Sequence, residues 1–321
     1  MTGVADWYPP IEPYETGMLD VGDGNQVYWE TCGNPAGKPA LVVHGGPGSG
    51  CTPGHRRSFD PARYRVVLFD QRGCGRSRPL ADDPAVDLGC NTTGHLVADM
   101  ERLRVHLGIE RWLLWGASWG STLLLAYAQR YPRRVSQIVI SGVTTTRRSE
   151  IDWLYRGLYR FFPRQWEQFR AGAGEAAPDE DLIAAYGRLM ADPDPAVRAR
   201  AAADWSAWED ATISLDPDGN PGAYSARPPD LLLARARLCA HYFAHGAWLE
   251  EGELLAGAHR LVGIPGVLIQ GRMDMGGLDT AWELARSWPG AELAVIERSG
   301  HSGSAAMTAR QVAALDDFAS R

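Results

Sequence analysis

Residues 112–121 read Trp-Leu-Leu-Trp-Gly-Ala-Ser-Trp-Gly-Ser, and this stretch decides the fold of the chain. Residues 112–115 are apolar and predict a buried strand, whereas residues 121–129 predict a helix. Between them lies a Gly-x-Ser-x-Gly motif centred on Ser118. A serine held in a tight turn from strand to helix is exposed at the end of the strand, where it can act as a nucleophile. Taken alone, the motif could also be an ordinary glycine-rich turn.

Two more residues with suitable chemistry follow strand-like runs later in the chain. Asp274 comes after residues 267–270, and His301 comes after residues 293–296. The chain order serine, aspartate, histidine is that of α/β-hydrolases. We therefore predict that His301 takes the proton of Ser118 and that Asp274 orients the imidazole. Asp279 is the nearest alternative acid, but it falls at the start of the following helix, where a carboxylate commonly has a structural role.

The first core strand is followed by a glycine-rich loop at residues 44–50, His-Gly-Gly-Pro-Gly-Ser-Gly. Small residues let backbone N–H groups approach a developing oxyanion, and we predict that the amides of Gly46 and Trp119 form the oxyanion hole. A phosphate-binding loop is the alternative, but neither a Gly-Lys-Ser/Thr ending nor GxGxxG spacing is present. Residues 70–77, Asp-Gln-Arg-Gly-Cys-Gly-Arg-Ser, follow the second core strand, and we expect them to brace this loop.

Strand-like and helix-like segments alternate along both ends of the chain, which indicates an α/β protein. Apolar runs predict buried parallel strands at residues 40–43, 66–69, 112–115 and 138–140, after a hairpin over residues 17–31. The alternation lapses where tryptophan- and arginine-rich helical segments occur. We predict an α/β-hydrolase fold, with a mostly parallel sheet flanked by helices. Residues 1–143 and 259–321 are expected to form the core, and residues 144–258 an inserted helical cap.

Composition narrows the classes of function. The chain has 321 residues, of which 45% are hydrophobic and 22% charged, and its formal net charge is −7. An acidic balance without a basic block argues against nucleic-acid binding. The start lacks the pattern of a signal peptide, and no apolar run approaches the roughly 20 residues that span a bilayer. We therefore predict a cytoplasmic protein with no membrane or nucleic-acid partner, and the sequence makes no prediction of its oligomeric state.

The cysteines and histidines could in principle form disulfides, a reactive thiol or a metal site. Five cysteines without CxxC spacing indicate free thiols rather than disulfides or a structural zinc site. Cys74 could be a reactive thiol, but no base is evident beside it, which favours inert packing. His241 and His245 stand four residues apart near Cys239 and could ligate a metal, yet packing against neighbouring aromatic residues is favoured. We predict no metal and no cofactor.

Taken together, these motifs resemble the proline iminopeptidase (prolyl aminopeptidase) family of serine peptidases. The resemblance spans nearly the whole chain and includes Tyr8-Pro9-Pro10, the HGGPG loop, DQRGCGRS, Asn91-Thr92-Thr93, the GASWGS motif, GRMD and SGHS. It implies a cofactor-free triad beneath a helical cap. It also implies release of N-terminal proline from a small peptide, through an acyl-enzyme on Ser118.

The resemblance further implies how the cap would bind a substrate. The family's Trp-Glu motif matches Trp208-Glu209, so Glu209 would anchor the ammonium group of the substrate. The alternative is a solvated helix acid paired with an arginine such as Arg198 or Arg200.

Four substrate-binding positions depart from the family's pattern. Cys239 replaces a second amine-binding glutamate, Thr144 an aromatic residue, Ser141 an arginine and Met273 a tyrosine. Losing one charge-assisted contact costs about 1.5–3 kcal/mol. Two other functions therefore stay open: an amidase or esterase that acts on an amino-acid amide, ester or specialised metabolite, and a catalytically idle binding protein.

Overall fold

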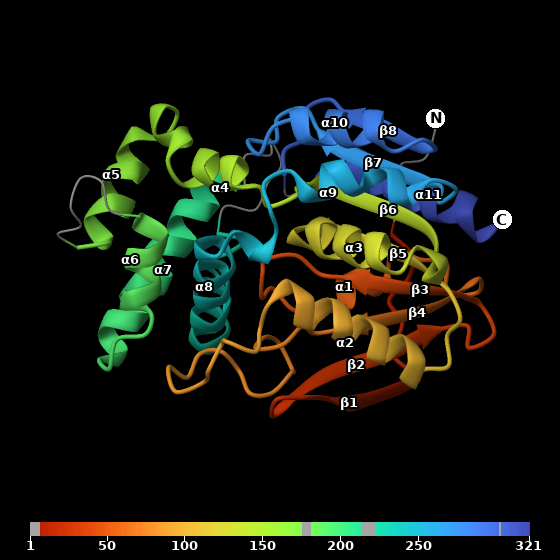
Figure 1. The fold of residues 1–321 in the computed structure, drawn as a ribbon, viewed down its shortest axis with the longest axis horizontal. Coiled ribbons are helices and arrows are strands. Elements are labelled where there is room, and N and C mark those ends of the chain that lie inside the picture. Colours follow the sequence, from red (N-terminus) through yellow and green to blue (C-terminus); the bar gives the residue numbers. More distant parts are fainter. Residues whose placement is uncertain (1–6, 175–180, 214–221, 302) are drawn as a thin grey trace.

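The computed structural model describes residues 7–174, 181–213, 222–301 and 303–321. The strands are β1 (Glu15–Gly22), β2 (Asn25–Gly33), β3 (Lys38–Val43), β4 (Tyr64–Phe69), β5 (Trp112–Ser118), β6 (Val135–Val143), β7 (Gly266–Gly271) and β8 (Ala291–Ile296). They form one sheet in the order β1-β2-β4-β3-β5-β6-β7-β8 (Figure 1). The pairs β1·β2 and β2·β4 are antiparallel, and the other neighbours are parallel. The predicted α/β fold with a mostly parallel sheet is thus confirmed.

The observed strands extend beyond the predicted apolar runs. β5, for example, continues through Gly116 to Ser118, and Ala117 still pairs with Ser141 of β6. Backbone pairing requires no apolar side chain, so strand ends made of glycine or polar residues give no hydrophobic signal. The leading hairpin is present, and its first strand forms an edge of the sheet as expected.

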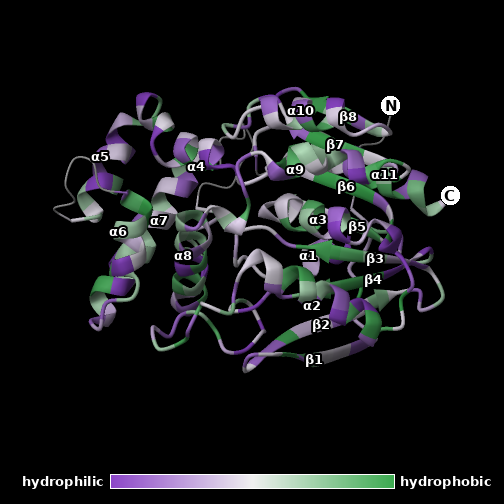
Figure 2. Ribbon diagram, viewed as in Figure 1, coloured by the Kyte–Doolittle hydropathy of each residue, from purple (hydrophilic) through white to green (hydrophobic). Residues whose placement is uncertain are grey.

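Both faces of the sheet are covered by helices. In β3, Leu41 and Val43 pack in one cluster with α2 (Thr93–His106), α3 (Trp119–Arg130) and α10 (Asp279–Ser287). The alternate residues Ala40 and Val42 pack in a second cluster with α11 (Ala305–Ala319). This double burial explains why the parallel strands read as continuous apolar runs, and Figure 2 shows the central strands as mostly hydrophobic.

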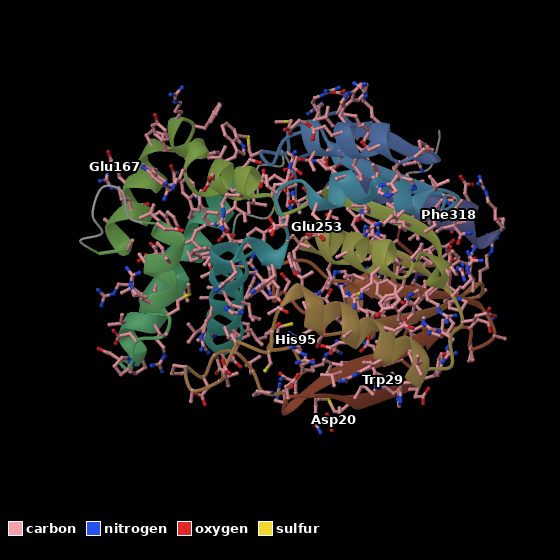
Figure 3. The ribbon with its side chains drawn as sticks, in the orientation of Figure 1. Asp20, Trp29, His95, Glu167, Glu253 and Phe318 are labelled. Atoms are coloured by element: carbon pink, nitrogen blue, oxygen red, sulfur yellow. The ribbon has the colours of Figure 1, made fainter. Side chains whose placement is uncertain are left out.

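The chain between β6 and β7 forms a separate helical layer beside the sheet (Figure 1). In Figure 3, Glu167 of this layer and Phe318 of α11 lie at opposite ends of the molecule. The layer contains α4 (Arg148–Tyr155), η2 (Gly157–Arg160), α5 (Pro163–Gly172), α6 (Leu182–Leu189), α7 (Pro195–Ile213), α8 (Pro229–Ala244) and η3 (Gly246–Trp248). Then α9 (Glu253–Ala256) and η4 (Gly257–Leu261) lead back to the sheet. The exact division into core and cap at residues 143 and 259 stays a prediction.

Aromatic packing holds the helical layer together. The ring of Phe169 stacks on Tyr186, with centroids 4.6 Å apart, and on Trp208 at 5.4 Å. Trp205 lies against Tyr155 at 4.7 Å. Such pairs add about 0.5–1.5 kcal/mol each beyond the area they bury. Trp205 and Trp208 therefore form the interior of this layer.

A buried ion pair ties the segment after β4 to α2. Arg72 donates from Nε and Nη2 to the two carboxylate oxygens of Asp99, at 2.7 and 2.8 Å. The side chains of Arg72 and Asp99 are only 2% and 0% exposed. Arg72 also donates to the carbonyls of Val21 and Cys90. One guanidinium thus joins β1, α2 and the loop that follows β4.

We expect Asp99→Asn to lower the free energy of unfolding by about 3–5 kcal/mol, because it removes the buried carboxylate that neutralises Arg72 and leaves the more exposed Asp23 as its ion-pair partner. Urea denaturation at neutral pH measures the change. Glu110→Gln, at an exposed carboxylate, is the matched control and should stay within about 0.5 kcal/mol of the native chain. Equal effects of the two substitutions would contradict the structural role of the pair.

Candidate active site

Ser118 lies at the junction of β5 and α3 in a strained backbone conformation. Its φ and ψ angles are 56° and −130°, a region that costs a residue with a side chain about 1–3 kcal/mol. The flanking glycines permit this turn. A Cβ on Gly116 would lie 2.6 Å from Leu124 Cδ2, and one on Gly120 would overlap the carbonyl oxygen of Val43. At this motif β5, α3 and β3 therefore approach so closely that only glycine fits at positions 116 and 120.

His301 and Asp274 form a hydrogen-bonded pair. His301 Nδ1 lies 2.7 Å from Asp274 Oδ2, and Gln270 Nε2 donates to the same oxygen at 2.9 Å. The amide of Gly276 donates to Asp274 Oδ1 at 2.8 Å. Because a carboxylate only accepts, the imidazole proton lies on Nδ1, which leaves the Nε2 lone pair able to take a proton.

The space around the imidazole is equally restricted. A Cβ on Gly142, the next-to-last residue of β6, would lie 3.3 Å from His301 Cε1. Ser118, Asp274 and His301 all line one cavity. The structure thus brings together the three side chains that the sequence predicted as a triad.

The glycine-rich loop packs directly on the turn that carries Ser118. A Cβ on Gly45 would lie 2.9 Å from the carbonyl oxygen of Ala117 and 3.3 Å from Ser118 Cβ. Gly46 has a φ of +121° and also lines the cavity. Trp119 is the first residue of α3, so its backbone N–H has no partner within the helix. Both predicted oxyanion donors therefore stand next to Ser118.

Polar side chains after β4 support this loop, as the sequence predicted. Gln71 Oε1 accepts from the Trp119 indole at 2.9 Å, while Gln71 Nε2 donates to the His44 carbonyl at 2.9 Å. The backbone amide of Gln71 donates to His44 Nε2 at 3.0 Å. Asp70 Oδ1 accepts from the amide of Cys51 at 2.7 Å, which fixes the far end of the loop.

The cavity above Ser118 has a volume of about 380 Å³, which lies within the range of small-molecule sites. Residues at the carboxyl ends of the parallel strands and residues of the helical layer both line it. Its apolar wall includes Val143, Ile151, Leu154 and Phe243. Its charged or polar wall includes Glu150, Tyr155, Glu209, Tyr224, Arg227 and Arg235.

Glu209 of α7 is buried and already paired. Its Oε1 accepts from the Tyr155 hydroxyl at 2.8 Å, and its Oε2 accepts from Arg235 of α8. Arg235 is also buried, and its guanidinium lies 4.4 Å from the centroid of the Tyr224 ring. The alternative that Glu209 is a solvated acid paired with Arg198 or Arg200 is therefore wrong, because its ion-pair partner is a buried arginine on another helix.

The other two predicted substrate residues differ in placement. Thr144 lines the cavity, and its hydroxyl donates to Glu150 Oε2 at 2.9 Å. Cys239 is fully buried and is not among the described residues that line the cavity. Its thiol donates to the Pro47 carbonyl at 3.3 Å, so it packs behind the glycine-rich loop.

The thiols of Cys74 and Cys239 are poorly suited to nucleophilic attack. Burial raises the pKa of Cys74 well above its usual value and that of Cys239 to about 12. Cys74 Sγ does lie 3.6 Å from His44 Nε2, a neighbour that the sequence did not reveal. That nitrogen already accepts from the Gln71 amide, and burial lowers the pKa of His44. Both residues therefore stay neutral.

Metal-ligand atoms lie close together at one place among the described residues, formed by Asp23, Cys90 and His95. Asp23 is paired with Arg72, and His95 Nδ1 is bonded to Thr92 Oγ1. These two contacts account for the group without an ion. His241 and His245 instead pack against Trp248, with ring centroids 4.9 and 4.7 Å away.

Comparison with known proteins agrees with the fold. A family model described as "alpha/beta hydrolase fold" matches residues 38–304. A probable proline iminopeptidase of Streptomyces coelicolor is 52% identical over 97% of this chain and 97% of its own length. A proline iminopeptidase of Xylella fastidiosa is 47% identical over 92% and 93%, respectively.

The chain belongs to the proline iminopeptidase family of α/β hydrolases. Solved structures support the fold alone. A proline iminopeptidase of Mycobacterium smegmatis has a TM-score of 0.56 at 19% identity and covers 95% of each chain. An esterase of Rhodococcus has a TM-score of 0.60 at 17% identity, covering 95% of this chain and 98% of the esterase. Among the described residues, no helix is long and apolar enough to cross a membrane.

Among the polar and charged residues of the cavity wall, sequence reasoning predicted Glu209 and missed Glu150, Tyr155, Tyr224, Arg227 and Arg235. Arg235 could have been found, because it precedes Cys239 by four residues and so lies on the same face of α8. Tyr155 and Arg227 reach the cavity only through packing of the helical layer. No local pattern marks either of them.

We expect Asp274→Asn to lower kcat by about 10,000-fold with a smaller effect on KM, because the wrong imidazole tautomer would face Ser118. Steady-state kinetics on a prolyl arylamide measure this. The control is Asp279→Asn, at the rival acid, which is exposed on the first turn of α10 and should retain activity within a few-fold. A large loss for Asp279→Asn with little change for Asp274→Asn would reverse the assignment.

Proposed function

We propose that this chain is a serine aminopeptidase that releases an N-terminal residue, proline first, from small peptides through an acyl-enzyme on Ser118. Membership of the proline iminopeptidase family supports the activity. The observation that carries the mechanism is the pair of His301 and Asp274 in the same cavity as the strained Ser118 turn.

In the proposed reaction, His301 Nε2 takes the Ser118 proton as Oγ attacks the carbonyl carbon of the N-terminal residue. The amides of Gly46 and Trp119 donate to the oxyanion. His301 then gives its proton to the departing amine, and a water molecule activated by the same nitrogen hydrolyses the ester. Asp274 keeps the imidazole proton on Nδ1 and stabilises the imidazolium.

Glu209 is the proposed anchor for the substrate's amine. Each of its oxygens accepts one hydrogen bond from the described residues, and a carboxylate oxygen accepts up to two, which leaves acceptor capacity toward the cavity. Thr144 is proposed to contact the same residue of the substrate from the wall of β6. Cys239 acts on the site only through Pro47, behind the loop.

One observation favours the second candidate, an amidase or esterase that does not require a free amine. Arg235 compensates the charge of Glu209, so the cavity attracts an ammonium less strongly than an unpaired carboxylate would. The two functions differ in their demand for a charged N-terminus. The peptide substrate and a cytoplasmic location are part of the first proposal.

We expect the purified enzyme to hydrolyse prolyl arylamide and to turn over N-acetylprolyl arylamide at least about tenfold less efficiently, because the blocked nitrogen loses a charge-assisted hydrogen bond. Release of the arylamine measures both rates, with Ser118→Ala as the blank. Equal turnover of free and blocked substrates would favour the amidase or esterase. No turnover of these arylamides or of short acyl esters would favour an idle fold.

We expect Glu209→Gln to lower kcat/KM for free prolyl arylamide by about 10- to 100-fold and for a short acyl ester far less. The substitution also leaves Arg235 without its counterion, so the double variant Glu209→Gln with Arg235→Met is the matched control. If both variants lose ester and arylamide activity equally, Glu209 is structural rather than an anchor.

A further inference from the structure

Arg227 is a charged side chain of the cavity wall that the proposed mechanism does not use. It lies on the segment between α7 and α8 and lines the same cavity as Ser118. Its Nη1 donates to the carbonyl of Ser49 at 3.1 Å, which places the guanidinium against the glycine-rich loop. Ser49 is only three residues from Gly46, the proposed oxyanion donor. The guanidinium therefore lies in the wall of the cavity, against the loop that carries this donor.

The position of Arg227 is fixed by its surroundings. The amides of Tyr224 and Ser225 donate to the two oxygens of Asp210 in α7, at 2.7 and 3.1 Å. The Tyr224 ring in turn stacks on the guanidinium of Arg235. These contacts hold the segment on α7 and α8, so Arg227 is directed toward the loop rather than into solvent.

The acids of the cavity wall are already compensated. Glu209 is paired with Arg235 and accepts from Tyr155. Glu150 lies 3.5 Å from Arg147 and also accepts from threonine hydroxyls. Asp274 is bonded to His301, Gln270 and Gly276.

Arg227, in contrast, forms no ion pair with the described part of the chain, and its buried Nε has no hydrogen-bond partner there. Burial and the neighbouring Arg235 lower the pKa of its guanidinium. A partly buried guanidinium with unfilled donors is completed by a planar anion, and a carboxylate matches its fork of N–H groups.

We propose that Arg227 binds the C-terminal carboxylate of a dipeptide, so that the preferred substrate is a dipeptide rather than a longer peptide. This inference rests on the aminopeptidase function proposed above. In a dipeptide, the free amine and the free carboxylate flank the scissile bond. Glu209 and Arg227 both line the cavity, so an amine and a carboxylate at the two ends of one small substrate have a residue of opposite charge available in the same wall.

The test compares substrates that differ in whether they carry a carboxylate and at which position. Pro-Ala, Pro-Ala-amide and Pro-Asp-amide are hydrolysed by the native enzyme, by Arg227→Gln and by Arg227→Lys, and released proline is quantified. We expect the native enzyme to prefer Pro-Ala over Pro-Ala-amide by about 10- to 100-fold in kcat/KM. Arg227→Gln should reduce this ratio to nearly one, and Arg227→Lys should keep part of it. Arg286→Gln, at an exposed arginine of α10, should leave the ratio unchanged.

Each outcome decides the inference. A native ratio near one, or an unchanged ratio in Arg227→Gln, overturns it. Pro-Asp-amide turned over as well as Pro-Ala overturns the dipeptide assignment, since a side-chain carboxylate would then suffice. Because a ratio is measured on one preparation, partial misfolding of a variant does not produce it.

Two further measurements separate failure of this inference from failure of the proposed function: turnover of prolyl arylamide, which has no carboxylate, and binding of the dipeptide. Turnover of prolyl arylamide with no preference for Pro-Ala leaves the aminopeptidase intact and removes only the carboxylate site. If no N-terminal substrate is turned over, calorimetry on Ser118→Ala still decides. We expect Pro-Ala to bind at least about tenfold more tightly than Pro-Ala-amide, and Ser118→Ala with Arg227→Gln to lose this difference. Equal binding, or no binding, overturns the inference.

Discussion

The close approach of β3, β5 and α3 around Ser118 is the constraint on which the rest of the site depends. Gly116 and Gly120 allow it, because a side chain at either position would collide with Leu124 or with the Val43 carbonyl. The turn carries Ser118 at a φ of 56°, where an ordinary residue is strained. Burial of the apolar strands on both faces of the sheet provides the free energy that holds this conformation.

The helical layer contributes charged side chains to the wall of the cavity. Its interior consists of packed aromatic rings, which support the helices that carry the polar groups of the cavity wall. In this chain the acid Glu209 meets a buried arginine, Arg235, and a second arginine reaches the catalytic loop. The cavity therefore combines an acceptor for an amine with a donor for an anion. That pattern of charge suits a small substrate that carries both groups.

Sequence reasoning succeeded where function depends on local geometry. Ser118, Asp274 and His301 each follow a strand, and parallel strands end at one edge of the sheet, so their meeting could be predicted. Sequence reasoning failed where a contact forms only after a helix of the cap packs on another helix or on a loop. The partner of Glu209 is on α8 rather than at neighbouring arginines, and Cys239 points at Pro47 rather than at the cavity. Neither contact has a signature in the order of residues along one element.

The central claim is that Ser118 attacks the carbonyl of an N-terminal proline. A proline-derived α-aminophosphonate diphenyl ester tests it directly. When a nucleophile attacks the phosphorus, the reagent loses phenol and the phosphonyl group stays on the nucleophile as a stable adduct. Intact-protein and peptide mass spectrometry locate that adduct. We expect one adduct per chain, on the peptide that contains Ser118, and none in Ser118→Ala. An adduct on another residue such as Cys74, or no adduct on the native enzyme, would contradict it.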